Sequence, residues 1–270
     1  MTDASVIPVD VQADIRGRLA AAEREHGVRV LLAVESGSRA WGFASPDSDY
    51  DVRFIYAPPP DWYLDIEEKR DVIEYPIVDE IDINGWDVRK ALNLFRRSNP
   101  AFVEWIQSPI VYAQEGFFAD KSRELLPKVY DCARGIGHYR SMAWNNYRGY
   151  LRDNLVPLKK YFYVLRPLLA IRWIERFGRP PPIEFDRLLA MLDGDDRLLG
   201  EIARLLEKKK AAGEMERAAR IEPLNAFIES ELAAADARSL VKGSKGETLA
   251  LLNALFREVL AETGHRVQVG

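Results

Sequence analysis

The chain has 270 residues and a mass of 30.8 kDa; 47% of its residues are apolar, 30% are charged, and its net charge is -4. This composition is typical of an ordinary soluble globular protein with one large domain or two modest ones, and it argues against a disordered chain. The negative charge also argues against indiscriminate polyanion binding, although it leaves a local basic groove open.

The sequence lacks the features of a secreted or membrane protein. No stretch approaches the roughly 20 uninterrupted apolar residues of a membrane span. The start, MTDASVIPVD, has neither the basic nor the apolar region of a signal peptide, so we expect a cytoplasmic protein with no membrane partner. The single cysteine, Cys132, excludes an internal disulfide. With only three histidines and many carboxylates, any catalytic metal is expected to be a hard, oxygen-ligated ion.

The strands are predicted in the first 85 residues. Hydrophobic periodicity and turn residues predict, in chain order, a helix at Val9–His26, a strand at 28–35, a turn with one helical turn at 36–42, a strand at 50–56, two short strands at 71–76 and 77–84, a break at Gly85, and a helix at 87–98 with Asp87 as its N-cap.

Beyond Pro109 the pattern becomes helical. Helices are predicted at 117–126, 136–151, 156–176, 185–192, 197–212, 221–234 and 245–263. The sequence therefore predicts an α+β fold with a short mixed sheet, with an α/β domain over residues 1–115 and a mostly α-helical domain over residues 116–270.

The first predicted strand ends in Gly37-Ser38. Glycine permits a tight turn and a close backbone approach, while the serine hydroxyl and exposed N–H groups are able to hold a phosphate at a helix N-terminus. Taken alone, a Gly-Ser pair after a strand is more often an ordinary turn.

Two aspartates, Asp49 and Asp51, flank Tyr50 at the entry to the next strand. Because strand side chains alternate between faces, both carboxylates project the same way, about 7 Å apart along the strand. Two like charges held side by side favour a cation between them. The alternative is a charged strand edge that discourages pairing with another chain.

A third carboxylate follows in the segment EIDIN, where Ile81 and Ile83 point to one face and Glu80 and Asp82 to the other. If this strand lies beside the strand at 50–56, Asp82, rather than Glu80, completes a three-carboxylate site for two metal ions. A solvated edge strand is the alternative.

These residues resemble the signature of the DNA polymerase beta nucleotidyltransferase superfamily: Gly37-Ser38, then Asp49-x-Asp51, then a carboxylate on a later strand. More closely, the chain is similar to a bacterial and phage family of predicted nucleotidyltransferases named for an RNA repair pathway. The similarity is carried by four segments: GSRAWGFASPDSDYDVRFIY, IDINGWDVRKAL, NPAFVEWIQSPIVY and KKYFYVLRPLLAIRW.

The resemblance implies a catalytic site in which Asp49, Asp51 and Asp82 hold two Mg²⁺ (or Mn²⁺) ions and a nucleoside triphosphate is the substrate. Gly37 and Ser38 would hold the triphosphate. Arg39 is a candidate phosphate contact, with a surface arginine at a helix start as the alternative.

In similar enzymes a lysine of the helical part contacts the β- or γ-phosphate. Lys160 is our choice here, with Lys159 second. Tyr163 is a candidate for stacking on the base, the alternative being an aromatic residue of the helical core.

The expected function is therefore the transfer of a nucleoside monophosphate from an NTP to an acceptor hydroxyl, with release of pyrophosphate. Interleaved basic and aromatic residues in helices over 139–176 favour an RNA 3′ end, in a tRNA or a damaged RNA, as the acceptor. Two alternatives remain: a catalytically silent nucleotide- or RNA-binding module, and a toxin–antitoxin component that modifies tRNA or a protein.

Overall fold

The computed structural model describes residues 7–211, 217–236 and 246–267. The described residues within Met1–Ala40, Asp49–Val129 and Ser244–Gly270 form one compact unit, and those within Trp41–Ser48 and Tyr130–Gly243 form a second. The division expected at residue 115 differs from this grouping. The helix after that residue and the last helix of the chain belong with the sheet, and the short segment Trp41–Ser48 belongs with the later helices.

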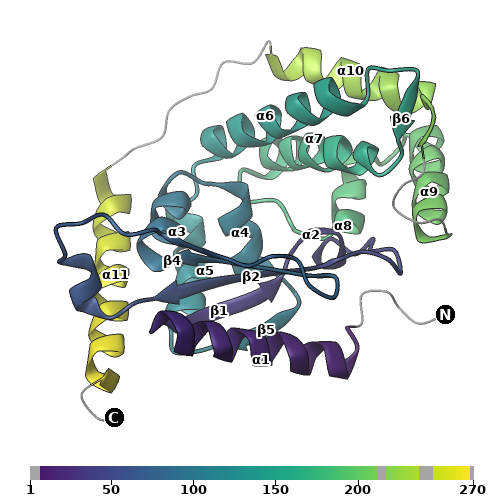
Figure 1. The fold of residues 1–270 in the computed structure, drawn as a ribbon. Coiled ribbons are helices and arrows are strands. Elements are labelled where there is room, and N and C mark those ends of the chain that lie inside the picture. The colour runs from purple at the N-terminus through teal and green to yellow at the C-terminus, as the bar shows by residue number, and fades with distance from the viewer. Residues whose placement is uncertain (1–6, 212–216, 237–245, 268–270) are drawn as a thin grey trace. The chain divides into compact units, whose positions relative to one another are not determined.

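The first unit is built on a five-stranded mixed sheet in the order β3-β4-β2-β1-β5 (Figure 1). Its strands are β1 (Arg29–Glu35), β2 (Tyr50–Ala57), β3 (Val72–Glu74), β4 (Ile81–Asp87) and β5 (Val111–Gln114). Strands β2 and β4 run parallel and the other neighbours pair antiparallel. The expected α+β class with a short mixed sheet is confirmed.

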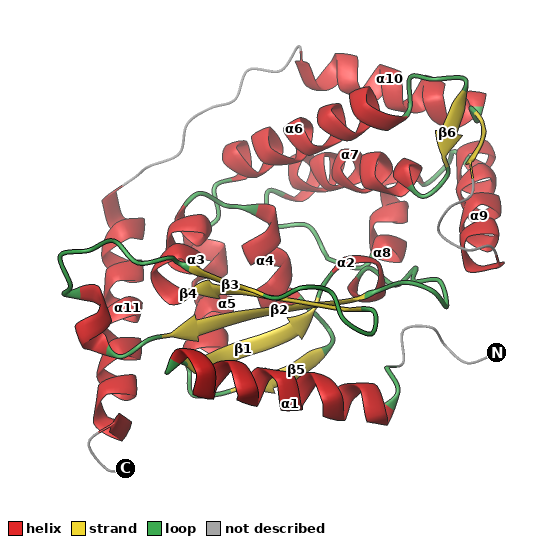
Figure 2. Ribbon diagram, in the orientation of Figure 1, coloured by secondary structure: helices red, strands yellow, loops and turns green. Residues whose placement is uncertain are grey.

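Seven helical segments accompany this sheet in the described part of the first unit. They are α1 (Val9–His26), α2 (Gly37–Ala40), η1 (Pro60–Tyr63), α3 (Val88–Arg96), α4 (Pro100–Gln107), α5 (Phe118–Val129) and α11 (Gly246–Val267) (Figure 2). Helix α1 has the predicted bounds, and Gly27 ends it in the left-handed conformation at φ 60°. Asp87 caps α3 as predicted, because its side chain accepts the N–H groups of Arg89 and Lys90.

The two faces of the sheet differ in character. On one face, Val52, Phe54 and Ile83 join Ile15 and Leu19 of α1 in a buried apolar cluster. The alternate residues of β2 and β4 point to the other face, where the Trp86 ring stacks on Trp105 of α4 with 3.8 Å between ring centroids. This second face carries the polar residues considered below.

The second unit is mostly helical. Its elements are α6 (Cys132–Tyr150), β6 (Leu155–Pro157), α7 (Lys160–Phe177), α8 (Phe185–Leu189), η2 (Ala190–Leu192), α9 (Asp196–Ala211), β7 (Arg217–Ala219) and α10 (Glu222–Asp236). Helix α7 supplies most of the core of this unit, since twelve of its residues are buried. Within the described residues, none of the helices combines the length and the apolar character needed to cross a bilayer.

Several local predictions differ from the structure. The strand predicted at 77–84 runs from Ile81 to Asp87, the helix predicted from residue 136 begins at Cys132, and helix α4 was not predicted. Gly85 does not end a strand but lies inside β4, opposite Phe54. A helix predicted from residue 156 begins at Lys160, because residues 155–157 form β6 and pair with β7. Strand β5 was not predicted. The predicted helix starting at Lys245 corresponds to α11, although Lys245 itself lies outside the described residues.

Candidate active site

The parallel pairing of β2 and β4 places Asp51 directly opposite Asp82. The pairing begins with Tyr50 beside Ile81, and the Tyr50 N–H donates to the Glu80 carbonyl at 2.8 Å. Because side chains alternate along both strands, the two aspartates share the face opposite Val52 and Ile83. The sequence predicts one site for these two carboxylates only if the two strands are neighbours, and β2 and β4 are neighbours.

A guanidinium group joins the two carboxylates. Arg53 Nη2 donates to Asp51 Oδ1 at 3.0 Å and to Asp82 Oδ2 at 2.7 Å. The second oxygen of Asp82 accepts from the Asn84 amide at 2.6 Å. One cation therefore balances two like charges that would otherwise repel each other. Sequence reasoning overlooked Arg53, although the alternation that paired Asp49 with Asp51 also places Arg53 on their face.

The turn at Gly37 lies against the carboxylate of Asp51. Gly37 has φ 61°, and a Cβ atom at this position would lie 2.9 Å from Asp51 Cγ and overlap its Oδ2 atom. The Ser36 N–H donates to the Asp51 carbonyl at 2.8 Å. Glycine is required here twice, by the backbone conformation and by the space that Asp51 fills. Ser38 follows in the four-residue helix α2 and is 8% exposed.

Arg39 and Asp49 lie at the edge of this group. The Arg39 side chain is only 5% exposed; its Nε donates to the Asp49 carbonyl at 3.3 Å and its guanidinium lies 4.1 Å from the centroid of the Tyr50 ring. It is therefore not the surface arginine of the alternative interpretation, while its contact with a phosphate stays a prediction. Asp49 is exposed.

Glu35, at the end of β1, is not among the predicted site residues, because in the sequence it looks like an ordinary polar residue at the end of a strand. It is fully buried, and its carboxylate accepts the Asp51 N–H at 2.9 Å and the Tyr112 O–H at 2.5 Å. Burial raises its pKa from 4.5 to about 7, with a smaller contribution from the negative charge of Asp51, while the two hydrogen bonds oppose the rise. Glu35 thus fixes the backbone of Asp51 from behind.

The donor set can be compared with what a divalent cation requires. Asp51 and Asp82 offer oxygen atoms that already share one cationic partner, Arg53, so this pair suits a hard metal ion. In the part of the chain that the structure describes, no three His, Cys, Asp or Glu side chains gather closely enough to hold a metal. The structure thus brings Asp51 and Asp82 together, and the role of Asp49 as a further ligand stays a prediction.

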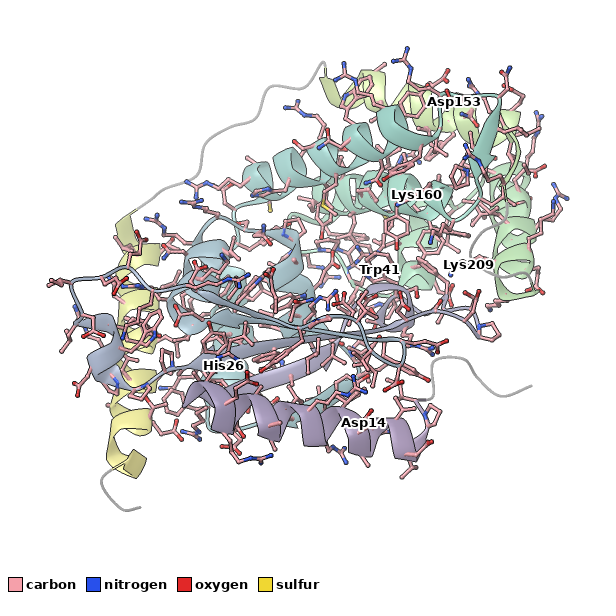
Figure 3. The ribbon with its side chains drawn as sticks, viewed as in Figure 1. Asp14, His26, Trp41, Asp153, Lys160 and Lys209 are labelled. Atoms are coloured by element: carbon pink, nitrogen blue, oxygen red, sulfur yellow. The ribbon has the colours of Figure 1, made fainter. Side chains whose placement is uncertain are left out.

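The remaining predicted residues, Lys160 and Tyr163, lie in the second unit at the start of α7. Lys160 Nζ is 4.2 Å from the centroid of the Tyr150 ring and 4.6 Å from that of Tyr163. The Tyr163 ring meets the Trp41 ring edge-on at 5.6 Å; Trp41 and Lys160 are labelled in Figure 3. Lys159 is the residue before the helix. The structure pairs Lys160 with Tyr163, and their role toward a nucleotide stays a prediction.

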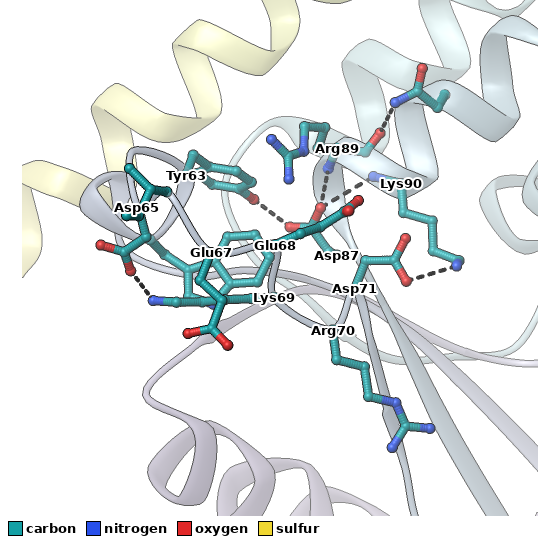
Figure 4. A pocket seen from close by; sticks show the side chains of 13 residues that line it. Tyr63, Asp65, Glu67, Glu68, Lys69, Arg70, Asp71, Asp87, Arg89 and Lys90 are labelled. Carbon is teal, nitrogen blue, oxygen red and sulfur yellow. Dashed lines mark hydrogen bonds and ion pairs between the residues drawn. The ribbon is translucent and has the colours of Figure 1, made fainter.

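A separate cavity of about 800 Å³ lies at the other end of β4, where Asp87 leads into α3 (Figure 4). Tyr63 donates its O–H to the buried Asp87 carboxylate, and Lys90 Nζ binds Asp71 at 2.9 Å. Burial raises the pKa of Asp87 above its ordinary value. None of the predicted site residues lines this cavity, and two ion pairs, Asp65 with Lys69 and Asp71 with Lys90, lie in its wall.

The mixed sheet with its opposed aspartates and glycine turn agrees with the nucleotidyltransferase fold that the family resemblance implies. The chain belongs to the RNA repair pathway DNA polymerase beta family (RlaP), whose family model matches residues 11–258. It is 45% identical over 241 residues to the uncharacterized protein YcgL of Bacillus subtilis (strain 168), covering 89% of this chain and 93% of that protein. A solved nucleotidyltransferase-like protein from Exiguobacterium sibiricum 255-15 is a distant likeness, with 11% identity, a TM-score of 0.32, and coverage of 95% of this chain and 77% of that one.

Proposed function

We propose that this protein is a metal-dependent nucleotidyltransferase that moves a nucleoside monophosphate from an NTP to an acceptor hydroxyl. The observation that carries the proposal is the direct opposition of Asp51 and Asp82 on β2 and β4, with the Gly37 turn packed against Asp51. Membership of a DNA polymerase beta-like family supports the same reaction class. In this reaction the acceptor oxygen bonds to the α-phosphorus, the acceptor proton passes to solvent, and the bond to the departing pyrophosphate breaks.

The predicted site residues of the first unit have the following roles in this proposal. Asp51 and Asp82, with Asp49, would hold Mg²⁺ or Mn²⁺. Bound divalent ions would lower the pKa of the acceptor hydroxyl and neutralise charge on the leaving pyrophosphate. Gly37 and Ser38 would hold the triphosphate through backbone N–H groups and the Ser38 hydroxyl. The side of Gly37 where a Cβ atom would stand already faces the Asp51 carboxylate.

Three further contacts to the nucleotide are proposed. Arg39 would donate to a phosphate oxygen, which a charged donor does more strongly than a neutral one. Lys160, with Lys159 as the alternative, would bind the β- or γ-phosphate. Tyr163 would stack on the base, because an aromatic ring accepts any base face.

An RNA 3′ end, in tRNA or in damaged RNA, is the acceptor that we propose. The support comes from α6 and the start of α7, where cations and aromatic rings alternate. Arg148 lies 5.2 Å from the centroid of the Trp144 ring, and Tyr150, which is 43% exposed, lies under Lys160. Arginines bind phosphates and aromatic rings stack on unpaired bases, so this surface suits single-stranded RNA.

The test is pyrophosphate release from each of the four NTPs with Mg²⁺ or Mn²⁺, with and without total cellular RNA. We expect release that depends on RNA in the wild type and is lost in Asp51→Asn. Asp120→Asn is the matched control, since Asp120 is an exposed aspartate of the same unit whose carboxylate accepts from Arg123 and Gln114. It should keep wild-type activity.

The outcomes separate the alternatives. Release without RNA would indicate a small-molecule, protein or self-modifying acceptor. Release that is equal in Asp51→Asn would contradict the assignment of the carboxylates. No release from any NTP, together with metal-dependent NTP binding, would favour a silent nucleotide-binding module.

A further inference from the structure

Arg53 occupies the position between the two carboxylates that the proposed function assigns to a metal. Its side chain is 18% exposed, and both ends of its guanidinium fork are engaged. Nη1 donates to the carbonyls of Val52 at 3.0 Å and Asp82 at 2.7 Å, and Nη2 donates to the carboxylates of Asp51 and Asp82. A single nitrogen atom therefore bonds to both carboxylates.

Arg53 and a divalent metal ion would therefore compete for the carboxylate oxygens of Asp51 and Asp82. A divalent ion needs the same oxygen atoms at about 2.0–2.1 Å, and it would stand a few ångströms from a full positive charge. A divalent ion and a guanidinium at such a distance repel each other, and they do so more strongly near a protein surface than in water. Because a guanidinium carries a positive charge, Arg53 has to leave the carboxylates or be balanced by an anion. A triphosphate is an anion that a guanidinium binds well.

We propose that Arg53 is a positioning residue that holds Asp51 and Asp82 together in the metal-free protein and turns to a phosphate of the nucleotide when the metal ion is bound. Metal binding at these aspartates is therefore weak without nucleotide and strong with it. This inference rests on the proposed function, because that function supplies both the metal and the triphosphate. The inference adds that tight binding of the metal ion depends on bound nucleotide.

The test is a Mn²⁺ titration of the full chain, followed by the electron paramagnetic resonance signal of free Mn²⁺. It is run without nucleotide and with the α,β-methylene analogue of ATP, which resists transfer. Without nucleotide, Arg53→Gln should bind Mn²⁺ about tenfold or more tightly than the wild type, because one competing charge is removed. With the analogue, the wild type should gain more affinity than Arg53→Gln does, after correction for Mn²⁺ bound by the analogue itself.

Arg18→Gln is the matched control. Arg18 also bridges two carboxylates of the first unit, Asp14 at 2.8 Å and Asp79 at 3.0 Å, and its side chain is 24% exposed. Its removal should leave Mn²⁺ affinity unchanged. Arg53→Lys keeps the charge and loses the planar fork, so its affinity should lie between those of the wild type and Arg53→Gln.

The outcomes are decisive for Arg53. Equal or weaker Mn²⁺ binding by Arg53→Gln, or an equal gain from the analogue in both proteins, would overturn the inference. If Arg53→Gln does not fold, Arg53→Lys decides: affinity without nucleotide at or below the wild-type value overturns it.

The Mn²⁺ titration and the pyrophosphate-release assay together separate this inference from the proposed function. Tighter Mn²⁺ binding by Arg53→Gln in a protein that transfers no nucleotide would support the role of Arg53 and contradict the nucleotidyltransferase function. Transfer activity without any change in Mn²⁺ binding would do the reverse.

Discussion

Replacement of Gly37 by alanine tests the geometry of the site with a single methyl group. The new Cβ would lie 2.9 Å from Asp51 Cγ, whereas non-bonded carbons rest at about 3.5–4.0 Å. The Asp51 carboxylate therefore has to move by more than about half an ångström. A displacement of about 1 Å at a catalytic group costs about 100-fold in rate, so we expect a fall of this order in pyrophosphate release.

The same substitution also strains the backbone, and a control separates the two effects. Gly27 has φ 60°, nearly the same as the φ 61° of Gly37, but a Cβ atom at Gly27 meets nothing within 4 Å. Both alanine variants should lose roughly 1–2 kcal/mol of stability from the left-handed conformation. Only Gly37→Ala should lose activity beyond what this loss of stability explains.

The assay pairs urea denaturation with pyrophosphate release and Mn²⁺ binding. The expected pattern is similar destabilisation of the two variants and about 100-fold lower activity in Gly37→Ala alone. If Gly37→Ala stays within threefold of Gly27→Ala in activity and Mn²⁺ affinity, the close contact between Gly37 and Asp51 does not matter for the site.

Three further predictions concern stability, packing and nucleotide binding. Burial raises the pKa of Glu35 from 4.5 to about 7, so its ionisation opposes folding: its contribution is most favourable below pH 4.5 and declines by about 3 kcal/mol as pH rises to about 7. Urea denaturation in EDTA should show this decline in the wild type and not in Glu35→Gln, and parallel pH profiles would refute it. Gly85→Ala should cost about 1–3 kcal/mol, because its Cβ would overlap the Phe54 ring, and adding Phe54→Leu should restore part of the loss in the same denaturation assay. Lys160→Ala should raise the KM for the NTP about tenfold through loss of a charged phosphate contact, with Lys159→Ala as the comparison; an unchanged KM would remove Lys160 from the site.

The pairing of the two aspartates could be predicted because it depends on local rules. Alternation along a strand places Asp49 and Asp51 on one face, and the same rule places Asp82 opposite to Ile81 and Ile83. The remaining condition was that the two strands be neighbours, which the family resemblance implied and the parallel β2–β4 pairing meets. Positions Asp49, Lys160 and Tyr163 stay predictions of function.

The parts that sequence could not predict depend on contacts between distant segments. Gly85 read as a strand breaker, yet glycine is required there because the Phe54 ring on the neighbouring strand fills the space of its Cβ. Strand β6 pairs with β7 about sixty residues later, and three-residue strands carry no periodic signal of their own.

The last helix and the buried acid show the same limit. Helix α11 was predicted as a helix, but its return to the first unit rests on contacts such as the ion pair of Arg29 with Glu262 at 3.1 Å. Glu35 looked like any polar strand end, and only the fold reveals that Tyr112 and the backbone of Asp51 enclose it.

Nucleotidyl transfer itself is tested most directly by following the phosphorus atoms of the substrate. The wild type is incubated with total cellular RNA, Mg²⁺ or Mn²⁺, and each NTP labelled with ³²P at either the α- or the γ-phosphate. If the protein transfers a nucleoside monophosphate, α-label enters the acceptor in amounts equal to the pyrophosphate released, and γ-label leaves with the pyrophosphate. Transfer of γ-label to an acceptor, or release of inorganic phosphate alone, would contradict this transfer.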